Sequence, residues 1–167
     1  MRQTSTLRLT LTKVHWWQRG LRLYDGKTQV GKVEYTRRFK MDAVATIMDE
    51  RWKIRQSGFW KSSFEFSTPD QSMAPVTIRP NFGGKVEWKG ADGKIYTYRK
   101  IKWWKHSWAW FDMNENTIME IRPDFSFSNK QAQIIIHNSS LPDIPVMTLI
   151  GIFIFQLQKA RAAASAT

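Results

Sequence analysis

A long apolar block near the C-terminus constrains the fold of this chain more than any other feature. Residues 146–157 read Val-Met-Thr-Leu-Ile-Gly-Ile-Phe-Ile-Phe-Gln-Leu, interrupted only by Thr148, Gly151 and Gln156. A helix without a polar face must be enclosed by protein or by lipid. The uncharged span 144–158 has 15 residues, which makes a helix about 22 Å long. A bilayer core requires about 20 apolar residues, so the block predicts a helix buried in protein.

The residues around this block predict where the helix begins and ends. Asp143 can cap the first turn, and Pro145 follows at a position where a proline removes no helical hydrogen bond. Lys159 and Arg161 would lie near the C-terminal end, where cations interact favourably with the helix dipole. We therefore expect a central helix over about 144–163.

Short β-strands are predicted for almost all of the chain before the helix. Apolar and polar residues alternate with the period of a strand that buries one face, as Leu7, Leu9 and Leu11 do. Turn signals such as Asp92-Gly93 separate these segments. The predicted strands cover residues 6–12, 20–24, 28–36, 41–48, 51–55, 59–67, 75–79, 84–89, 94–101, 106–112, 117–122 and 131–137.

Many short strands followed by one apolar helix predict a barrel with the helix inside. An eight-stranded barrel is filled by its own side chains, whereas a larger barrel leaves room for a helix. The predicted fold class is therefore mainly β, a closed antiparallel barrel of about twelve strands around a buried C-terminal hydrophobic helix. The length of 167 residues predicts a single domain over 1–167, with the strands at about 6–137.

The chain is strongly basic, and its cations gather in clusters. It has 26 Lys and Arg residues against 14 Asp and Glu residues, a formal charge of +12, which favours nucleic acid or an anionic membrane surface as a partner. Cations beside aromatic residues can bind a phosphate and an adjacent base or acyl chain. The alternative is a solvated outer face whose aromatic side chains point inward. The candidate anionic-ligand residues are Arg37, Arg38, Lys40, Arg51, Lys53, Arg55, Lys100, Lys102 and Lys105.

The sequence lacks signatures of catalysis and of metal binding. Without cysteine there is no thiolate nucleophile and no Cys-ligated zinc. His15, His106 and His137 are widely separated and lack metal-ligand spacing. Neither a Walker-type phosphate loop nor a G-x-S-x-G motif is present. We predict a non-enzymatic protein with no catalytic residue, no metal and no cofactor.

Several short motifs follow one another in an order that is found in a known family. They are Gly31-Lys32-(x)2-Tyr35, Phe39-Lys40-Met41-Asp42-Ala43-Val44-Ala45-Thr46-Ile47, Trp52-Lys53-Ile54, Gly58-Phe59-Trp60-Lys61 and Gly93-Lys94-Ile95-Tyr96. With the closing apolar helix, this order resembles the tubby C-terminal-like superfamily, including its bacterial, LURP-one-related and phospholipid scramblase branches. The resemblance implies a closed barrel of twelve strands around a C-terminal hydrophobic helix.

The same resemblance implies a class of ligand, although this chain lacks several features of the family. The eukaryotic tubby branch binds phosphoinositides through a basic pocket, and the scramblase branch acts on phospholipids at membranes. This chain lacks the cysteine-rich palmitoylation stretch of the scramblases, an acidic calcium-binding run before the helix, and a long N-terminal extension. The resemblance therefore supports the scaffold and an anionic-ligand surface, but not lipid scrambling, calcium dependence or a nuclear role.

The net positive charge, the clusters of cations and the family resemblance together predict a non-catalytic binding module. Its expected ligand is an anionic lipid headgroup or another phosphorylated molecule, bound on a basic barrel face. Two alternatives stay open: a single-stranded nucleic-acid binding protein that uses exposed aromatic residues, and a tail-anchored membrane protein whose last helix spans the bilayer. The N-terminus has no apolar region of the kind that directs secretion. The expected location is cytoplasmic, with peripheral attachment to a membrane if the ligand is a phospholipid.

Overall fold

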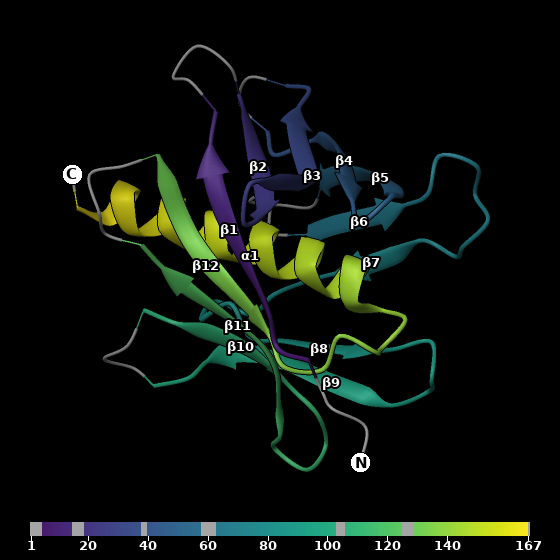
Figure 1. Cartoon of the computed structure of the whole chain (residues 1–167). Helices are drawn as coiled ribbons and strands as arrows, with labels where there is room; N and C mark the ends of the chain where they lie inside the picture. The colour runs from purple at the N-terminus through teal and green to yellow at the C-terminus, as the bar shows by residue number, and fades with distance from the viewer. Residues whose placement is uncertain are drawn as a thin grey trace. The chain divides into compact units, whose positions relative to one another are not determined.

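Twelve β-strands are followed by one α-helix in the described part of the chain (Figure 1). The structure is a computed structural model that describes residues 5–14, 19–37, 40–57, 63–102, 106–124 and 129–166. The strands are β1 (Leu7–Lys13), β2 (Gly20–Asp25), β3 (Thr28–Tyr35), β4 (Ala43–Ile47), β5 (Glu50–Ser57), β6 (Ser63–Ser67), β7 (Val76–Ile78), β8 (Val86–Lys89), β9 (Ile95–Lys100), β10 (Trp108–Phe111), β11 (Thr117–Pro123) and β12 (Lys130–Ile136), and the helix is α1 (Ile144–Ser165).

All twelve strands belong to one antiparallel sheet. Their order is β7-β6-β5-β4-β3-β2-β1-β12-β11-β10-β9-β8. Strands that follow one another along the chain are therefore neighbours in the sheet, except that β1 lies beside β12 and that β7 and β8 lie at the two ends. The predicted fold class, mainly β with about twelve antiparallel strands and a buried C-terminal helix, is confirmed.

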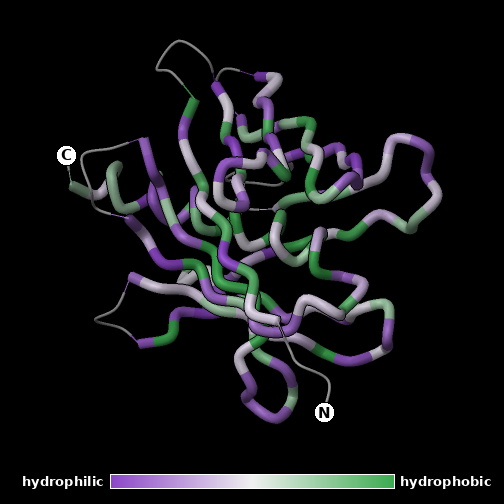
Figure 2. The backbone as a smooth tube through the Cα atoms, viewed as in Figure 1, coloured by the Kyte–Doolittle hydropathy of each residue, from purple (hydrophilic) through white to green (hydrophobic). Residues whose placement is uncertain are grey.

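The alternation that predicted the strands is also the pattern of their burial. In β5, Trp52 and Ile54 are buried whereas Arg51, Lys53 and Arg55 are exposed. Figure 2 shows the same change between hydrophobic and hydrophilic residues along many strands. Each predicted strand overlaps an observed one. The largest difference is at β6, which was predicted over 59–67; residues 59–62 lie outside the described part of the chain.

One hairpin was predicted correctly and one turn was missed. Asp92-Gly93 lies between β8 and β9, and Gly93 has the positive φ of 78° that favours glycine. The turn between β4 and β5 has no glycine, although Met48 and Asp49 both have positive φ, 48° and 69°. Two successive residues in this region are typical of the type I′ turns that connect antiparallel strands. Aspartate tolerates this region better than methionine, so the pairing of β4 with β5 imposes the conformation chiefly on Met48.

Contacts divide the chain into two compact units. The first, which we call the strand unit, comprises Arg8–Arg79 and Pro123–Ile134. The second, which we call the helix unit, comprises Met1–Leu7, Pro80–Arg122 and Ile135–Thr167. The strand unit therefore holds β2 to β7, and the helix unit holds β8, β9, β10 and α1.

The apolar block forms the buried part of α1 in the helix unit. Buried residues run from Ile144 to Leu157, and only Pro145 and Gln156 among them are partly exposed. Length and composition alone would allow α1 to cross a membrane, but 61% of its apolar window is buried within the structure. The prediction of a helix buried in protein is thus confirmed.

Two side chains from the strands of the helix unit bind the backbone of α1. The Tyr98 hydroxyl donates a hydrogen bond to the carbonyl of Gly151 (3.0 Å), and the Trp110 indole N–H donates to the carbonyl of Met147 (2.9 Å). The helix lies close to the sheet here, because a Cβ atom at Gly151 would come within 2.8 Å of the Ile121 side chain. Glycine is therefore required for this close approach.

Both predicted signals at the ends of α1 are corrected by the structure. Asp143 precedes the helix but makes no side-chain capping bond; its carboxylate instead accepts a hydrogen bond from the Ala91 backbone N–H (2.8 Å). The helix continues past residue 163 to Ser165, so its last turn contains no cation. Alanine is the best helix former, and the alanine-rich tail 160–166 explains this extension.

The bond between Asp143 and Ala91 gives the first prediction. We expect Asp143→Ala to lower the free energy of unfolding by about 1–3 kcal/mol, because it leaves a backbone donor without its acceptor. Asp143→Asn is the matched control, since an amide oxygen can still accept this bond, and it should lower stability less. Urea unfolding followed by circular dichroism measures both. Equal losses in the two variants would show that the acceptor is not what matters at this position.

Candidate functional site

The candidate site is built on the exposed face of β5 in the strand unit. Period-two alternation places Arg51, Lys53 and Arg55 on one face of the sheet while Trp52 and Ile54 lie in the core. Lys53 is paired with Val44 of β4 and with Ser67 of β6, so uncharged residues lie on both sides of it. The predicted cluster on β5 is therefore present as a row of exposed cations.

A shallow depression next to this row brings two predicted clusters together. Its volume is about 330 Å³. Arg37 reaches it from the segment after β3, and Lys53 and Arg55 reach it from β5. We call it the basic depression, and it is lined by Thr36, Arg37, Asp42, Ala43, Val44, Lys53, Ile54 and Arg55.

Asp42 is the single carboxylate of the basic depression. One of its oxygens accepts a hydrogen bond from the Gln56 backbone N–H (2.8 Å), and the other lies 3.5 Å from Nε of Arg37. The Thr36 backbone N–H also donates to the Asp42 carbonyl (2.8 Å). Asp42 therefore closes the connection between β3 and β4, ties it to the end of β5 and orients Arg37.

The charge of the basic depression is not balanced by its own residues. Three cations and one carboxylate line it, which leaves an excess of positive charge. Among the described residues, no carboxylate lies within ion-pair distance of Lys53 or Arg55. By contrast, Arg22 and Lys32 on the neighbouring strands both lie 3.7 Å from the Glu34 carboxylate. The basic depression therefore carries a net positive charge, and the one described acidic residue paired with its cations across the strands is Glu65, opposite Arg55.

The other predicted residues lie elsewhere. Lys40 is partly exposed and does not line the basic depression, and Arg51 lines a separate depression of about 480 Å³ with Glu50 and Asp70. Arg38 and Lys105 fall outside the described part of the chain. Lys100 and Lys102 are exposed and belong to the helix unit.

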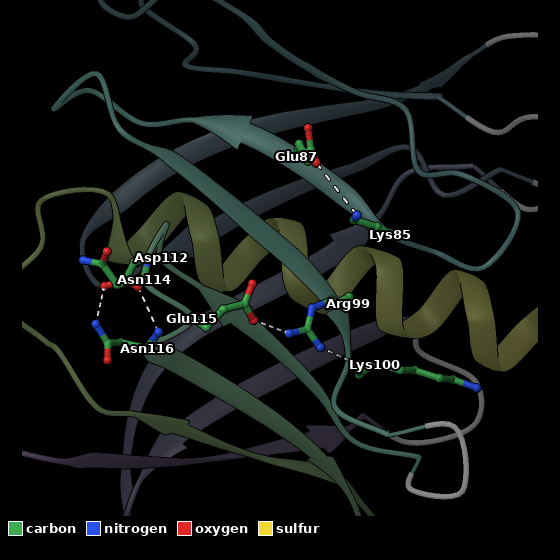
Figure 3. Close-up of polar contacts among 8 residues, drawn as sticks. All are labelled: Lys85, Glu87, Arg99, Lys100, Asp112, Asn114, Glu115 and Asn116. Carbon is green, nitrogen blue, oxygen red and sulfur yellow. Dashed lines mark hydrogen bonds and ion pairs between the residues drawn. The ribbon is translucent and has the colours of Figure 1, made fainter.

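Aromatic residues accompany the cations of the helix unit, but they are buried. Nζ of Lys100 lies 5.6 Å from the centre of the Trp108 ring, and the Arg99 guanidinium lies 4.1 Å from that of Phe111. Figure 3 shows Arg99 directed toward Glu115, with which it forms an ion pair, while the Lys100 side chain extends away from this pair. Trp108 and Phe111 are only 3% and 8% exposed. Their rings therefore present little surface to a ligand.

The acidic turn residues of the helix unit serve the fold. Asp112 accepts hydrogen bonds from the backbone N–H groups of Asn114 (2.8 Å) and Asn116 (2.9 Å) in the turn between β10 and β11 (Figure 3). Burial opposes the ionisation of Asp112, but a hydrogen bond from the Asn116 side chain (3.0 Å) and the two backbone bonds outweigh it and hold the pKa of Asp112 below the usual value. Among the described residues, no group of three or more histidine and acidic side chains could hold a metal ion.

Comparison with known proteins leaves the family open. No family model, no curated protein and no solved structure matches the chain. The resemblance to the tubby C-terminal-like superfamily therefore stays a prediction.

Proposed function

We propose that this chain is a non-catalytic binding module that holds the phosphate of a lipid headgroup, or of another phosphorylated ligand, in the basic depression. One observation carries the proposal. Arg37 and the β5 residues Lys53 and Arg55, which are well separated in the sequence, line one depression with a single carboxylate. Of the cations predicted from the sequence, these are the ones that share a described depression.

The side chains of the basic depression suit a phosphate group. A guanidinium can donate two parallel hydrogen bonds to phosphate oxygens, and a lysine adds a mobile point charge. Val44 is 42% exposed in the same depression and offers apolar contact to the carbon skeleton that carries the phosphate. Because the site is open to solvent, its attraction for an anion should weaken as salt screens the charges.

The proposal predicts that binding depends on the two β5 cations. The double variant Lys53→Gln/Arg55→Gln should bind phosphatidylserine vesicles and inositol trisphosphate about ten-fold more weakly, since exposed charge pairs each contribute up to about 1 kcal/mol. The matched control is Lys27→Gln/Lys89→Gln, which removes the same charge from two exposed positions outside the basic depression. At low salt, vesicle co-sedimentation measures the binding of phosphatidylserine vesicles, and calorimetry measures the binding of inositol trisphosphate.

The outcomes separate site binding from general attraction. Equal weakening in the two double variants would mean that net charge alone attracts the anion, and the proposal would fail. It would also fail if the wild-type chain bound neither probe at low salt. A single-stranded oligonucleotide is the third probe, and binding to it alone would favour the nucleic-acid alternative. Phe82 is the one exposed large aromatic residue among those described, whereas base stacking uses several exposed rings.

A further inference from the structure

Phe82 in the helix unit has the most exposed large hydrophobic side chain in the described part of the chain. Its exposed fraction is 95%, against 72% for Met113 and less than half for the others. It lies between β7 and β8, in the turn 81–85, which we call the Phe82 turn. A fully exposed phenylalanine does not contribute to the core, so the Phe82 ring is free to contact something outside the chain.

The Phe82 turn is held in place by its own hydrogen bonds and by the sheet. The backbone N–H of Asn81 donates to the carbonyl of Lys85 (3.0 Å), and the Asn81 side chain accepts from the Lys85 N–H (2.9 Å). Gly84 has a positive φ of 84° and lies against β10, because a Cβ atom there would come within 2.7 Å of the Trp108 ring. The turn therefore presents the Phe82 ring outward on a fixed support.

Two lysines lie close to the Phe82 turn or to the Trp108 ring on which the turn packs. Lys100 lies over the Trp108 ring that Gly84 contacts, and Lys85 closes the turn itself, with its side chain 49% exposed. Figure 3 shows both lysines, with Lys85 directed toward Glu87. The pair between Lys85 and Glu87 spans 3.8 Å at the surface, so it is weak and screened by salt.

We infer that the Phe82 turn inserts into the interfacial region of an anionic bilayer while Lys85 and Lys100 contact the lipid headgroups. This inference rests on the proposed function for its choice of an anionic lipid, but it uses different residues. It names the bilayer, rather than a soluble phosphorylated molecule, as the partner. The Phe82 ring supplies apolar burial, and the lysines supply attraction to the negative surface.

The surroundings of Phe82 favour a bilayer over a protein partner. The turn residues beside it are Asn81 and Gly83, both exposed and neither of them hydrophobic. A protein interface is usually formed around a contiguous apolar core rather than one ring. A bilayer interface accepts single aromatic rings at the level of the headgroups. One protruding ring, on a turn that ends in Lys85 and packs against the Trp108 ring under Lys100, therefore matches the bilayer better.

A single fluorescent label tests the insertion directly. The chain contains no cysteine, so Phe82→Cys creates a unique site for a polarity-sensitive dye. Vesicles of phosphatidylserine and phosphatidylcholine should shift the dye emission to the blue, and spin-labelled acyl chains should quench it. The matched control is Met113→Cys, an exposed position at the end of β10 away from Trp108, where the dye should stay in water.

A second variant measures how much the ring contributes. Phe82→Ser should weaken binding to the same vesicles about ten-fold, as expected for the loss of one buried aromatic side chain, and leave binding of inositol trisphosphate unchanged. The inference is overturned if the dye at position 82 does not respond on saturated vesicles, if Phe82→Ser binds them like the wild type, or if the wild type binds none at low salt.

The same experiments distinguish this inference from the proposed function. Loss of inositol trisphosphate binding in Lys53→Gln/Arg55→Gln with no dye response at position 82 would support the basic depression alone. A dye response, together with vesicle binding that Lys53→Gln/Arg55→Gln weakens no more than Lys27→Gln/Lys89→Gln does, would support insertion and remove the basic depression. A blue shift that depends on protein concentration and needs no vesicles would assign the Phe82 turn to contact between copies of the chain, which would overturn the inference.

Discussion

Trp110→Ala is expected to lower the free energy of unfolding by about 3–5 kcal/mol, as large-to-small changes of a buried tryptophan do. The Trp110 side chain is 0% exposed, and its indole N–H donates to the Met147 carbonyl of α1. Its ring lies 5.2 Å from that of Tyr98 and 6.2 Å from that of Trp88. The alanine variant therefore leaves a cavity between the sheet and the helix and removes one of their hydrogen bonds.

Two controls show which part of the effect comes from the buried position. Phe82→Ala makes a comparable truncation at a ring that is 95% exposed, so it should change stability by less than about 0.5 kcal/mol. Trp110→Phe keeps most of the apolar volume and loses the hydrogen bond, so its effect should lie between the two. Urea unfolding followed by circular dichroism measures all three. If Trp110→Ala were as mild as Phe82→Ala, the contact between β10 and α1 would not hold in solution.

The strands and the helix could be predicted because their signals are local. In β5 each buried residue is flanked by exposed ones, and the sequence alone shows this period. The apolar block 146–157 likewise contains enough information to require burial. The turn at Met48 and Asp49 could not be found in this way, because its positive φ values come from the pairing of the flanking strands. Asp143 was assigned a capping role because a carboxylate just before a helix can accept a hydrogen bond from the first turn. Its actual donor, the Ala91 backbone N–H, lies 52 residues away in the sequence.

In the candidate site, too, the features with a local sequence signal could be predicted and those that depend on distant contacts could not. The sequence predicted that Lys53 and Arg55 share a face, since they are two residues apart on a strand. It also indicated Arg37 as a cation, but not that the fold of the connection after β3 brings Arg37 to the same depression. That convergence depends on Asp42, whose carboxylate accepts a hydrogen bond from the backbone of Gln56, 14 residues away along the chain. The exposure of Phe82 could not be predicted from the sequence either. A phenylalanine between a proline-asparagine pair and two glycines is equally compatible with a buried side chain in a turn.

Gly151→Val is expected to destabilise the chain by about 3 kcal/mol, at the upper end of what overpacking a core usually does. A Cβ atom at this position would lie 2.8 Å from the Ile121 side chain, 3.3 Å from Tyr98 and 3.4 Å from Trp110. The two aromatic residues are 0% exposed, so they have little freedom to move aside. The branched side chain should therefore push α1 away from the sheet and break the bond from the Tyr98 hydroxyl to the Gly151 carbonyl.

The sign of this effect decides between an enclosed helix and a membrane-spanning one. Glycine is among the poorest helix formers, and valine is more favourable both in a helix and in lipid. If α1 were surrounded by lipid at Gly151, the substitution would be neutral or stabilising. Ala163→Val, at an exposed position of the same helix, is the control and should lower stability by less than about 1 kcal/mol. Thermal unfolding without detergent measures both variants, and a Gly151→Val chain as stable as the wild type would contradict the enclosure of the helix on which the whole interpretation of the fold depends.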